Sequence, residues 1–260
     1  MNPISSGAAT YVYGIALAEP FLDGSPPLRA PGIGGRGDPV RTVVFRDLVA
    51  VVSDVSGLHL GLSREHLLGH QQVLDEVLSR SDVLPFSFGT AAENDEEVRE
   101  LLLRDGFDAL HEQLECVRGC VELELKAFWD QEQLFAEIAE ENEEVRALRD
   151  RIVLQPDEVT SVEKITLGQL AAADIELKSD WESEGLLDYL EPHAVELLVR
   201  PNLSDTMLLN IACLVERARE AEFDAAVDSL AQAHAGRIVF NYVGPLPPYS
   251  FINIAFQADG

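Results

Sequence analysis

Residues 121–128, with the sequence Val-Glu-Leu-Glu-Leu-Lys-Ala-Phe, alternate apolar and charged side chains more regularly than any other part of the chain. Successive side chains of a β-strand point to opposite faces, so this alternation predicts a strand with one buried and one solvated face. The expected inward side chains are Val121, Leu123, Leu125 and Ala127, and the expected outward ones are Glu122, Glu124 and Lys126. Because the pattern of elements restarts after Gly119, we expect a domain boundary near Arg118.

The segments that follow predict the element order β-α-β-β-α-β. After helical sequence at about 131–190, strands are expected at 193–200, 206–215 and 237–244, with a helix between the last two. The strand at 206–215 is apolar on both faces, which is typical of a central position in a sheet. This order is that of a ferredoxin-like domain, whose first and third strands are central. Residues 119–260 are therefore predicted to be a ferredoxin-like α+β domain with a long helical insertion at about 131–190 and a C-terminal tail at 244–260.

Residues 1–118 show the order β-β-β-α-β-α and are predicted to form a modified ferredoxin-like α+β domain. Ser63 is expected to cap its first helix. Pro85 lacks a backbone donor, so its strand is expected to lie at a sheet edge or to start there. The expected strands are 11–18, 41–45, 50–55 and 83–89, the second and third forming a hairpin, and a second helix is expected at 94–114.

The charge balance excludes two kinds of partner. The chain of 260 residues has 19 Lys and Arg against 46 Asp and Glu, a formal net charge of −27. Such a surface repels phosphate backbones and anionic lipid headgroups, so neither nucleic acid nor membrane is expected as a partner. Three cysteines without a CxxC pair indicate a reducing compartment, and neither a signal peptide nor a membrane span is expected.

No catalytic constellation is evident. The glycines at 32, 34 and 37 match a dinucleotide fingerprint only formally, because no strand precedes them and no helix follows. His66 and His70 stand four residues apart without the glutamate of an HExxH site, and we interpret both as helix-surface histidines. The glutamates of 137–144 lack the spacing of a calcium loop and are interpreted as a solvated helix face. No catalytic residue, cofactor or metal ligand is predicted.

The C-terminal stretch 244–256 is unusual for a chain end. Its three prolines restrict the backbone and lower the entropy lost on docking, while Tyr249 and Phe251 carry large apolar areas. Two interpretations stay open: a tail packed on the protein's own C-terminal domain, or an adhesive segment for a partner. We expect a division, in which Phe251, Ile252 and Ile254 dock internally and Pro245–Tyr249 form an ordered corner that is partly available.

Residues 244–251, Gly-Pro-Leu-Pro-Pro-Tyr-Ser-Phe, resemble the GPWPPYSF signature of the gas vesicle L/F accessory proteins. Leu246 stands where the family usually has Trp, and Ser87 stands where Arg is expected. Further matches follow in the family's order: YVYGI at 11–15, FRDLVAVVS at 45–53, His70-Gln71, VLPFSFGT at 83–90, VELELK at 121–126 and LLNIACLVER at 208–217. The motif residues that are candidates for partner contact are Pro85, Phe88, Gly89, Gly244, Pro245, Pro247, Pro248, Tyr249 and Phe251.

This resemblance implies a non-enzymatic protein with two α+β domains and no cofactor. It implies a location in the cytoplasm or at the gas vesicle, as a minor component or assembly factor. The implied partners are the small, very apolar shell structural protein and other gas vesicle accessory proteins. From the residues alone, a second hypothesis stays open: a small-molecule-binding enzyme or sensor on a ferredoxin-like sheet, a fold that hosts many functions.

Overall fold

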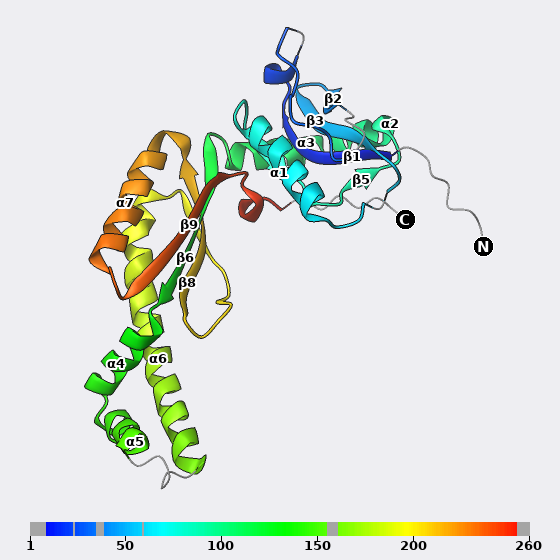
Figure 1. Ribbon diagram of the computed structural model, residues 1–260. Coiled ribbons are helices and arrows are strands. Elements are labelled where there is room, and N and C mark those ends of the chain that lie inside the picture. The colour runs from blue at the N-terminus through cyan, green and yellow to red at the C-terminus, as the bar shows by residue number, and fades with distance from the viewer. Residues whose placement is uncertain (1–8, 23, 35–38, 59, 155–160, 254–260) are drawn as a thin grey trace, which may run out of the picture. The chain divides into compact units, whose positions relative to one another are not determined.

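The computed structural model describes residues 9–22, 24–34, 39–58, 60–154 and 161–253 (Figure 1). It mixes helices and sheets and divides into two compact units. The first unit comprises Met1–Glu122 together with Pro245–Gly260, and the second comprises Leu123–Gly244. The first unit is therefore built from two separate stretches of the chain. None of the helices in the described ranges combines the length and the apolar composition that a membrane crossing requires.

The sheet of the first unit is centred on β1. Its strands are β1 (Ala9–Leu17), β2 (Arg41–Phe45), β3 (Leu48–Val55), β4 (Val83–Pro85) and β5 (Ala91–Ala92). They lie in the order β2-β3-β1-β4, with β5 also paired to β1, and the pairings within the sheet are antiparallel. The predicted hairpin is confirmed, because Phe45 pairs with Leu48 across a two-residue turn. Pro85 ends the edge strand β4, in agreement with the expected edge position.

An irregularity interrupts the pairing of β1 with β3. Val12 pairs with Val52 and Gly14 pairs with Val51, so Tyr13 is an extra residue, a β-bulge. A Cβ atom on Gly14 would lie 2.6 Å from the carbonyl oxygen of Leu84 in the neighbouring strand. Glycine is thus required here for the close approach of β4.

The first unit carries two helical regions. Helix α1 (Arg64–Leu78) begins as predicted, with the Ser63 hydroxyl accepting the backbone N–H of His66 at 3.1 Å. The predicted single helix over 94–114 is wrong. The chain forms α2 (Asp95–Glu97), a π-helical turn at Val98–Arg104 and α3 (Phe107–Cys116). The wide turn is closed by a bond from the N–H of Asp105 to the carbonyl of Glu100, and Gly106, a weak helix former, stands at the interruption.

The second unit contains a four-stranded sheet. Its strands are β6 (Cys120–Trp129), β7 (Glu196–Val199), β8 (Met207–Glu216) and β9 (Ile238–Leu246), in the order β7-β8-β6-β9. The two strands predicted to be central, β6 and β8, are central. The inward side chains predicted for β6 are buried, but Glu122 is also buried at 2% exposure, contrary to its predicted outward position. A carboxylate removed from water needs partners, and the C-terminal segment supplies them, as described below.

In its described residues the second unit also has the α-helices α4 (Gln131–Glu141), α5 (Glu143–Leu154), α6 (Ser161–Leu190) and α7 (Glu220–Ala233). The helical stretch predicted at about 131–190 is interrupted at Asn142, whose side-chain oxygen accepts the N–H groups of Glu144 and Val145. Figure 1 shows α6 and α7 packed beside the sheet, and α5 lying next to the first half of α6 beyond it.

Replacing Gly14 tests the close approach of β1 and β4. We expect Gly14→Ala to lower the free energy of unfolding by about 1–3 kcal/mol, because the new methyl group meets a backbone atom that cannot rotate away. Urea denaturation measures the change. Gly61→Ala is the matched control, since nothing lies within 4 Å of a Cβ atom there. Equal stability of the two variants would contradict this account.

Candidate functional site

The described part of the C-terminal segment is held by the first unit. The backbone N–H and the hydroxyl of Ser250 donate to the two carboxylate oxygens of Glu122, at 2.8 and 2.6 Å. The N–H of Asn253 donates to the side-chain oxygen of Gln113 at 2.9 Å. The predicted assignment of the tail at 244–260 to the C-terminal domain is therefore corrected from Pro245 onward. Ile254, also predicted to dock, lies outside the described residues.

His70 is the central contact of this docked segment. Its Nδ1 lies 2.9 Å from the hydroxyl of Tyr11, and its Nε2 lies 3.1 Å from the hydroxyl of Tyr249 and 3.2 Å from the carbonyl oxygen of Phe86. A carbonyl can only accept, so Nε2 carries the proton and Nδ1 accepts from Tyr11. The Tyr11 oxygen in turn accepts the N–H of Gly89 at 3.1 Å. Each group thus has a partner with the complementary role.

Aromatic rings pack around this imidazole. The rings of Tyr13 and His70 stack with centroids 5.6 Å apart, and Tyr11 meets Tyr13 edge-on at 4.9 Å. Phe88 lies 6.0 Å from His70 and 6.2 Å from Tyr11. We call Tyr11, Tyr13, His70, Phe88 and Tyr249 the histidine cluster. Its members come from β1, α1, the loop after β4 and the C-terminal segment, so it joins four parts of the chain.

Tyr13 extends the cluster to the loop before β2. Its hydroxyl lies 2.9 Å from the hydroxyl of Ser53 on β3 and accepts the backbone N–H of Ile33 at 2.9 Å. The same loop is held by Glu76 of α1, whose carboxylate accepts the N–H groups of Arg29 and Ala30. Arg80 donates to the carbonyl oxygens of Pro26 and Pro27, at 2.6 and 3.1 Å. Three side chains therefore hold the described part of this loop.

Burial keeps the histidine cluster uncharged. Desolvation lowers the pKa of His70 to about 4, although its bond to the carbonyl of Phe86 acts in the opposite direction. Desolvation also raises the pKa of Tyr11, Tyr13 and Tyr249. At neutral pH the imidazole and the phenols are neutral, and both ring nitrogens of His70 are engaged. The arrangement is that of a structural polar core rather than an acid–base pair facing a substrate.

The structure brings together only some of the predicted site residues. Phe88, Gly89 and Tyr249 meet in the histidine cluster, where Gly89 adopts a φ of 97° that favours glycine. Pro247 and Pro248 are buried beside Tyr249 in the sequence, whereas Gly244 and Pro245 are exposed. Phe251 is half-buried and closes a short turn by donating its N–H to the carbonyl of Pro248. Pro85 lies opposite Gly14 in the sheet.

Sequence reasoning missed the centre of the cluster. The interpretation of His70 as a helix-surface histidine is wrong, because α1 turns it toward β1 and leaves it 3% exposed. His66, one turn earlier, is half-buried and contacts the carbonyl of Gly61 through Nδ1. The available signal was the pair Tyr11 and Tyr13, two aromatic residues with polar tips in a strand of small and β-branched residues. Buried tyrosine hydroxyls need hydrogen-bond partners, and His70, on the helix that packs against this strand, is a suitable one.

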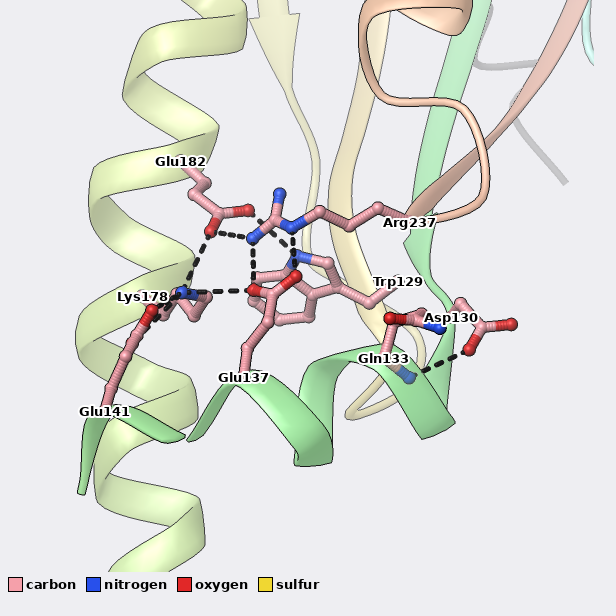
Figure 2. A network of polar contacts seen from close by, with 8 residues as sticks. All are labelled: Trp129, Asp130, Gln133, Glu137, Glu141, Lys178, Glu182 and Arg237. Carbon is pink, nitrogen blue, oxygen red and sulfur yellow. Dashed lines mark hydrogen bonds and ion pairs between the residues drawn. The ribbon is translucent and has the colours of Figure 1, made fainter. Parts of the chain in front are cut away.

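A second polar network lies inside the second unit, and Figure 2 shows it from close by. Arg237 donates to both oxygens of Glu137 at 2.5 and 2.8 Å and also contacts Glu182. Lys178 bridges Glu137, Glu141 and Glu182 at 3.2, 3.0 and 3.7 Å. We call these five residues the ion-pair network. It connects α4, α6 and the start of β9.

The ion-pair network corrects the interpretation of 137–144 as only a solvated helix face. The hydrogen bond from Arg237 lowers the pKa of Glu137, so this carboxylate stays ionised and paired. Trp129 adds a bond from its indole N–H to Glu182 at 3.0 Å. Glu140, Glu143 and Glu144 are exposed and fit the solvated interpretation.

Comparison with known proteins gives the family. The family model described as gas vesicle synthesis protein GvpL/GvpF matches residues 9–253. The match covers most of the chain, which therefore belongs to the GvpL/GvpF family. Gas vesicle protein F of Streptomyces sp. (strain CB03234) is 34% identical over 94% of this chain and 99% of its own length. Gas vesicle protein F of Haloferax mediterranei is 27% identical over 96% of this chain and 95% of its own length.

Solved structures agree with the fold. The crystal structure of gas vesicle protein GvpF from Microcystis aeruginosa matches with a TM-score of 0.76 and 27% identity, over 95% of this chain and 99% of that one. The crystal structure of GvpF from Anabaena sp. PCC7120 matches with a TM-score of 0.80 over 96% of this chain and 100% of that one. At 23% identity the second likeness concerns the fold alone.

The burial of His70 predicts a pH-dependent stability. The folded-state pKa of about 4 lies below the ordinary 6.5, so the stabilising contribution is complete above pH 6.5 and is lost as the pH falls toward 4. Between pH 7 and pH 5 the free energy of unfolding should fall by about 2 kcal/mol more in the parent chain than in His70→Gln. Urea denaturation at both pH values measures this difference. His66→Gln removes a histidine outside the cluster and is the control; a parent chain that behaves like His70→Gln would contradict the prediction.

Tyr249 tests the docking of the C-terminal segment. We expect Tyr249→Ala to cost roughly 3 kcal/mol in the free energy of unfolding, because a largely buried ring is lost. Tyr249→Phe removes only the hydroxyl near His70 and should cost about 1 kcal/mol. Thermal and urea unfolding give both values. Tyr189→Ala, which truncates an exposed tyrosine of the second unit, should change stability little, and a Tyr249→Ala variant as stable as this control would rule out docking.

Proposed function

We propose that this chain is a non-enzymatic accessory protein of gas vesicles, a minor component or assembly factor that binds the apolar shell structural protein. The observation that carries the proposal is the GvpL/GvpF family match over residues 9–253. Relatives that share nearly their whole length with the chain bear the name gas vesicle protein F. We further propose that it acts in the cytoplasm or at the gas vesicle, together with other gas vesicle accessory proteins.

The physical properties of the chain support an assembly role. A shell protein with exposed apolar surface aggregates before it polymerises unless a partner covers that surface. A partner with a net charge of −27 keeps such a complex soluble through repulsion between copies. The histidine cluster supports a non-catalytic role, because both nitrogens of its imidazole serve the fold.

We also propose that the two units are variants of one architecture. The order β7-β8-β6-β9 places the second, third, first and fourth strands of the second unit side by side, the order of a ferredoxin-like sheet. The first unit would be a modified ferredoxin-like unit. Its departures are the short strand β5 and the stretch between β1 and β2, whose described residues form no α-helix.

Among the motif residues, those left exposed are the candidates for contact with a partner. Gly244 and Pro245 lie at the exposed end of β9. Phe88 and Tyr249 are engaged within the first unit, so we assign them a role in the fold. This division refines the earlier expectation that Pro245–Tyr249 form a corner available to a partner.

Deleting the gene in its host tests the proposed function. We expect few or no gas vesicles by electron microscopy, with vesicles restored when the intact gene is supplied from a plasmid. The shell protein should be captured by the purified chain in a pull-down and not by an unrelated protein of similar acidity. Normal vesicle number and shape in the deletion strain would contradict the proposal.

A further inference from the structure

A hollow of about 640 Å³ lies beside the ion-pair network, wholly within the second unit. Residues of α4, α6, α7 and the start of β9 line it. The network of Figure 2, with Lys178, Glu182 and Arg237, belongs to this lining. Leu230 and Ile238 contribute apolar surface, so the hollow has both charged and apolar walls.

One face of α6 leaves aromatic side chains exposed at this hollow. Trp181 is 74% exposed and Tyr189 is 44% exposed, although both are large apolar residues. Gly185 stands midway between them, and nothing lies within 4 Å of a Cβ atom at that position. The spacing of four residues puts all three on the same side of the helix. A glycine in a helix interior weakens the helix, and here its effect is to leave open space between two aromatic rings.

The charges at the hollow are unbalanced. Its described lining contains five carboxylates against the two cations Lys178 and Arg237. Those two cations are already paired with Glu137, Glu141 and Glu182. The two remaining carboxylates, Glu184 and Asp188, are exposed and form no ion pair with any residue in the described ranges. Unpaired carboxylates beside an exposed indole suit an arginine or lysine side chain, which an indole face and a carboxylate both attract.

We propose that this hollow is a docking site for a basic, partly apolar segment of a partner protein. An arginine or lysine of that segment would lie against Trp181 with Glu184 and Asp188 as counter-charges, and an apolar neighbour would fill the space at Gly185. A second copy of this chain is a poor occupant, because each copy carries a net charge of −27. The proposal rests on the geometry of the second unit and does not depend on the shell protein being the partner.

The two tryptophans of the chain provide a readout of the binding position. Trp129 is 4% exposed and bonded to Glu182, whereas Trp181 is largely exposed. The probe is a fluorescently labelled helical peptide of about 16 residues, made of leucine, alanine and arginine. Anisotropy measures its affinity, and a blue shift with protection from acrylamide reports burial of Trp181. The same peptide with glutamine for arginine should bind about tenfold more weakly or worse.

A matched pair of glycine variants separates docking from general attraction to an acidic protein. Gly185→Leu fills the hollow. Gly168→Leu makes the same change in α6 at a position that has equally open space but does not line the hollow. Leucine favours a helix over glycine and neither change alters the net charge, so fold and general attraction are retained. We expect Gly185→Leu to weaken the arginine peptide about tenfold or more and Gly168→Leu to stay within roughly twofold of the parent.

If circular dichroism shows that Gly185→Leu alters the helix, a second pair of variants tests the proposal instead. Glu184→Gln with Asp188→Asn removes two charges at the hollow, and Glu140→Gln with Glu143→Gln removes two exposed charges elsewhere. Only the first pair should weaken the arginine peptide strongly. No binding by the parent chain, or equal weakening by both members of each pair, would overturn the proposal.

Discussion

The burial of one neutral imidazole is the constraint on which the first unit depends. His70 lies between Tyr11 and Tyr249, residues of the first strand and of the last described segment, and its contact with Tyr249 spans 179 positions of the sequence. An imidazole without partners is costly in a dry interior, so the two hydroxyls and the carbonyl of Phe86 have to be in place together. The turn at Gly89, which donates to the Tyr11 hydroxyl, and the docking of the C-terminal segment, which brings Tyr249, both serve that requirement.

The sequence predicted most of the strands because their signals are local. The strand β6, the β2-β3 hairpin and the doubly apolar β8 depend on neighbours a few residues away, and the structure confirms these elements. In detail the hairpin turn has two residues where four were expected at 46–49, and Glu122 departs from the predicted alternation. The helix cap at Ser63 was predictable for the same reason, because it joins two residues only three positions apart. The family motif at 244–251 likewise singled out the C-terminal segment before its contacts were known.

What the sequence left unpredicted depends on contacts between distant positions. Glu122 fits the polar side of an alternating strand, and only its bonds to Ser250 explain why it is buried. Glu137 fits an acidic helix surface by its sequence, and only its pairing with Arg237, a hundred positions later, shows that it belongs to an ion-pair network. For Glu122 and Glu137 the deciding partner lies outside the window in which periodicity can be measured. The interruptions at Asn142 and Gly106 are different, because local contacts mark them, such as the bonds from the N–H groups of Glu144 and Val145 to the Asn142 side chain.

The discontinuous make-up of the first unit sets the order in which the protein can fold on the ribosome. Residues 123–244, which form the whole second unit, are synthesised after β1 and α1 but before Pro245–Gly260. The second unit can therefore collapse while His70 still awaits Tyr249 and Glu122 still awaits Ser250. A nascent chain that has not yet reached Tyr249 and Ser250 thus carries a first unit whose His70 and Glu122 lack these partners, and the first unit is closed only when this segment docks.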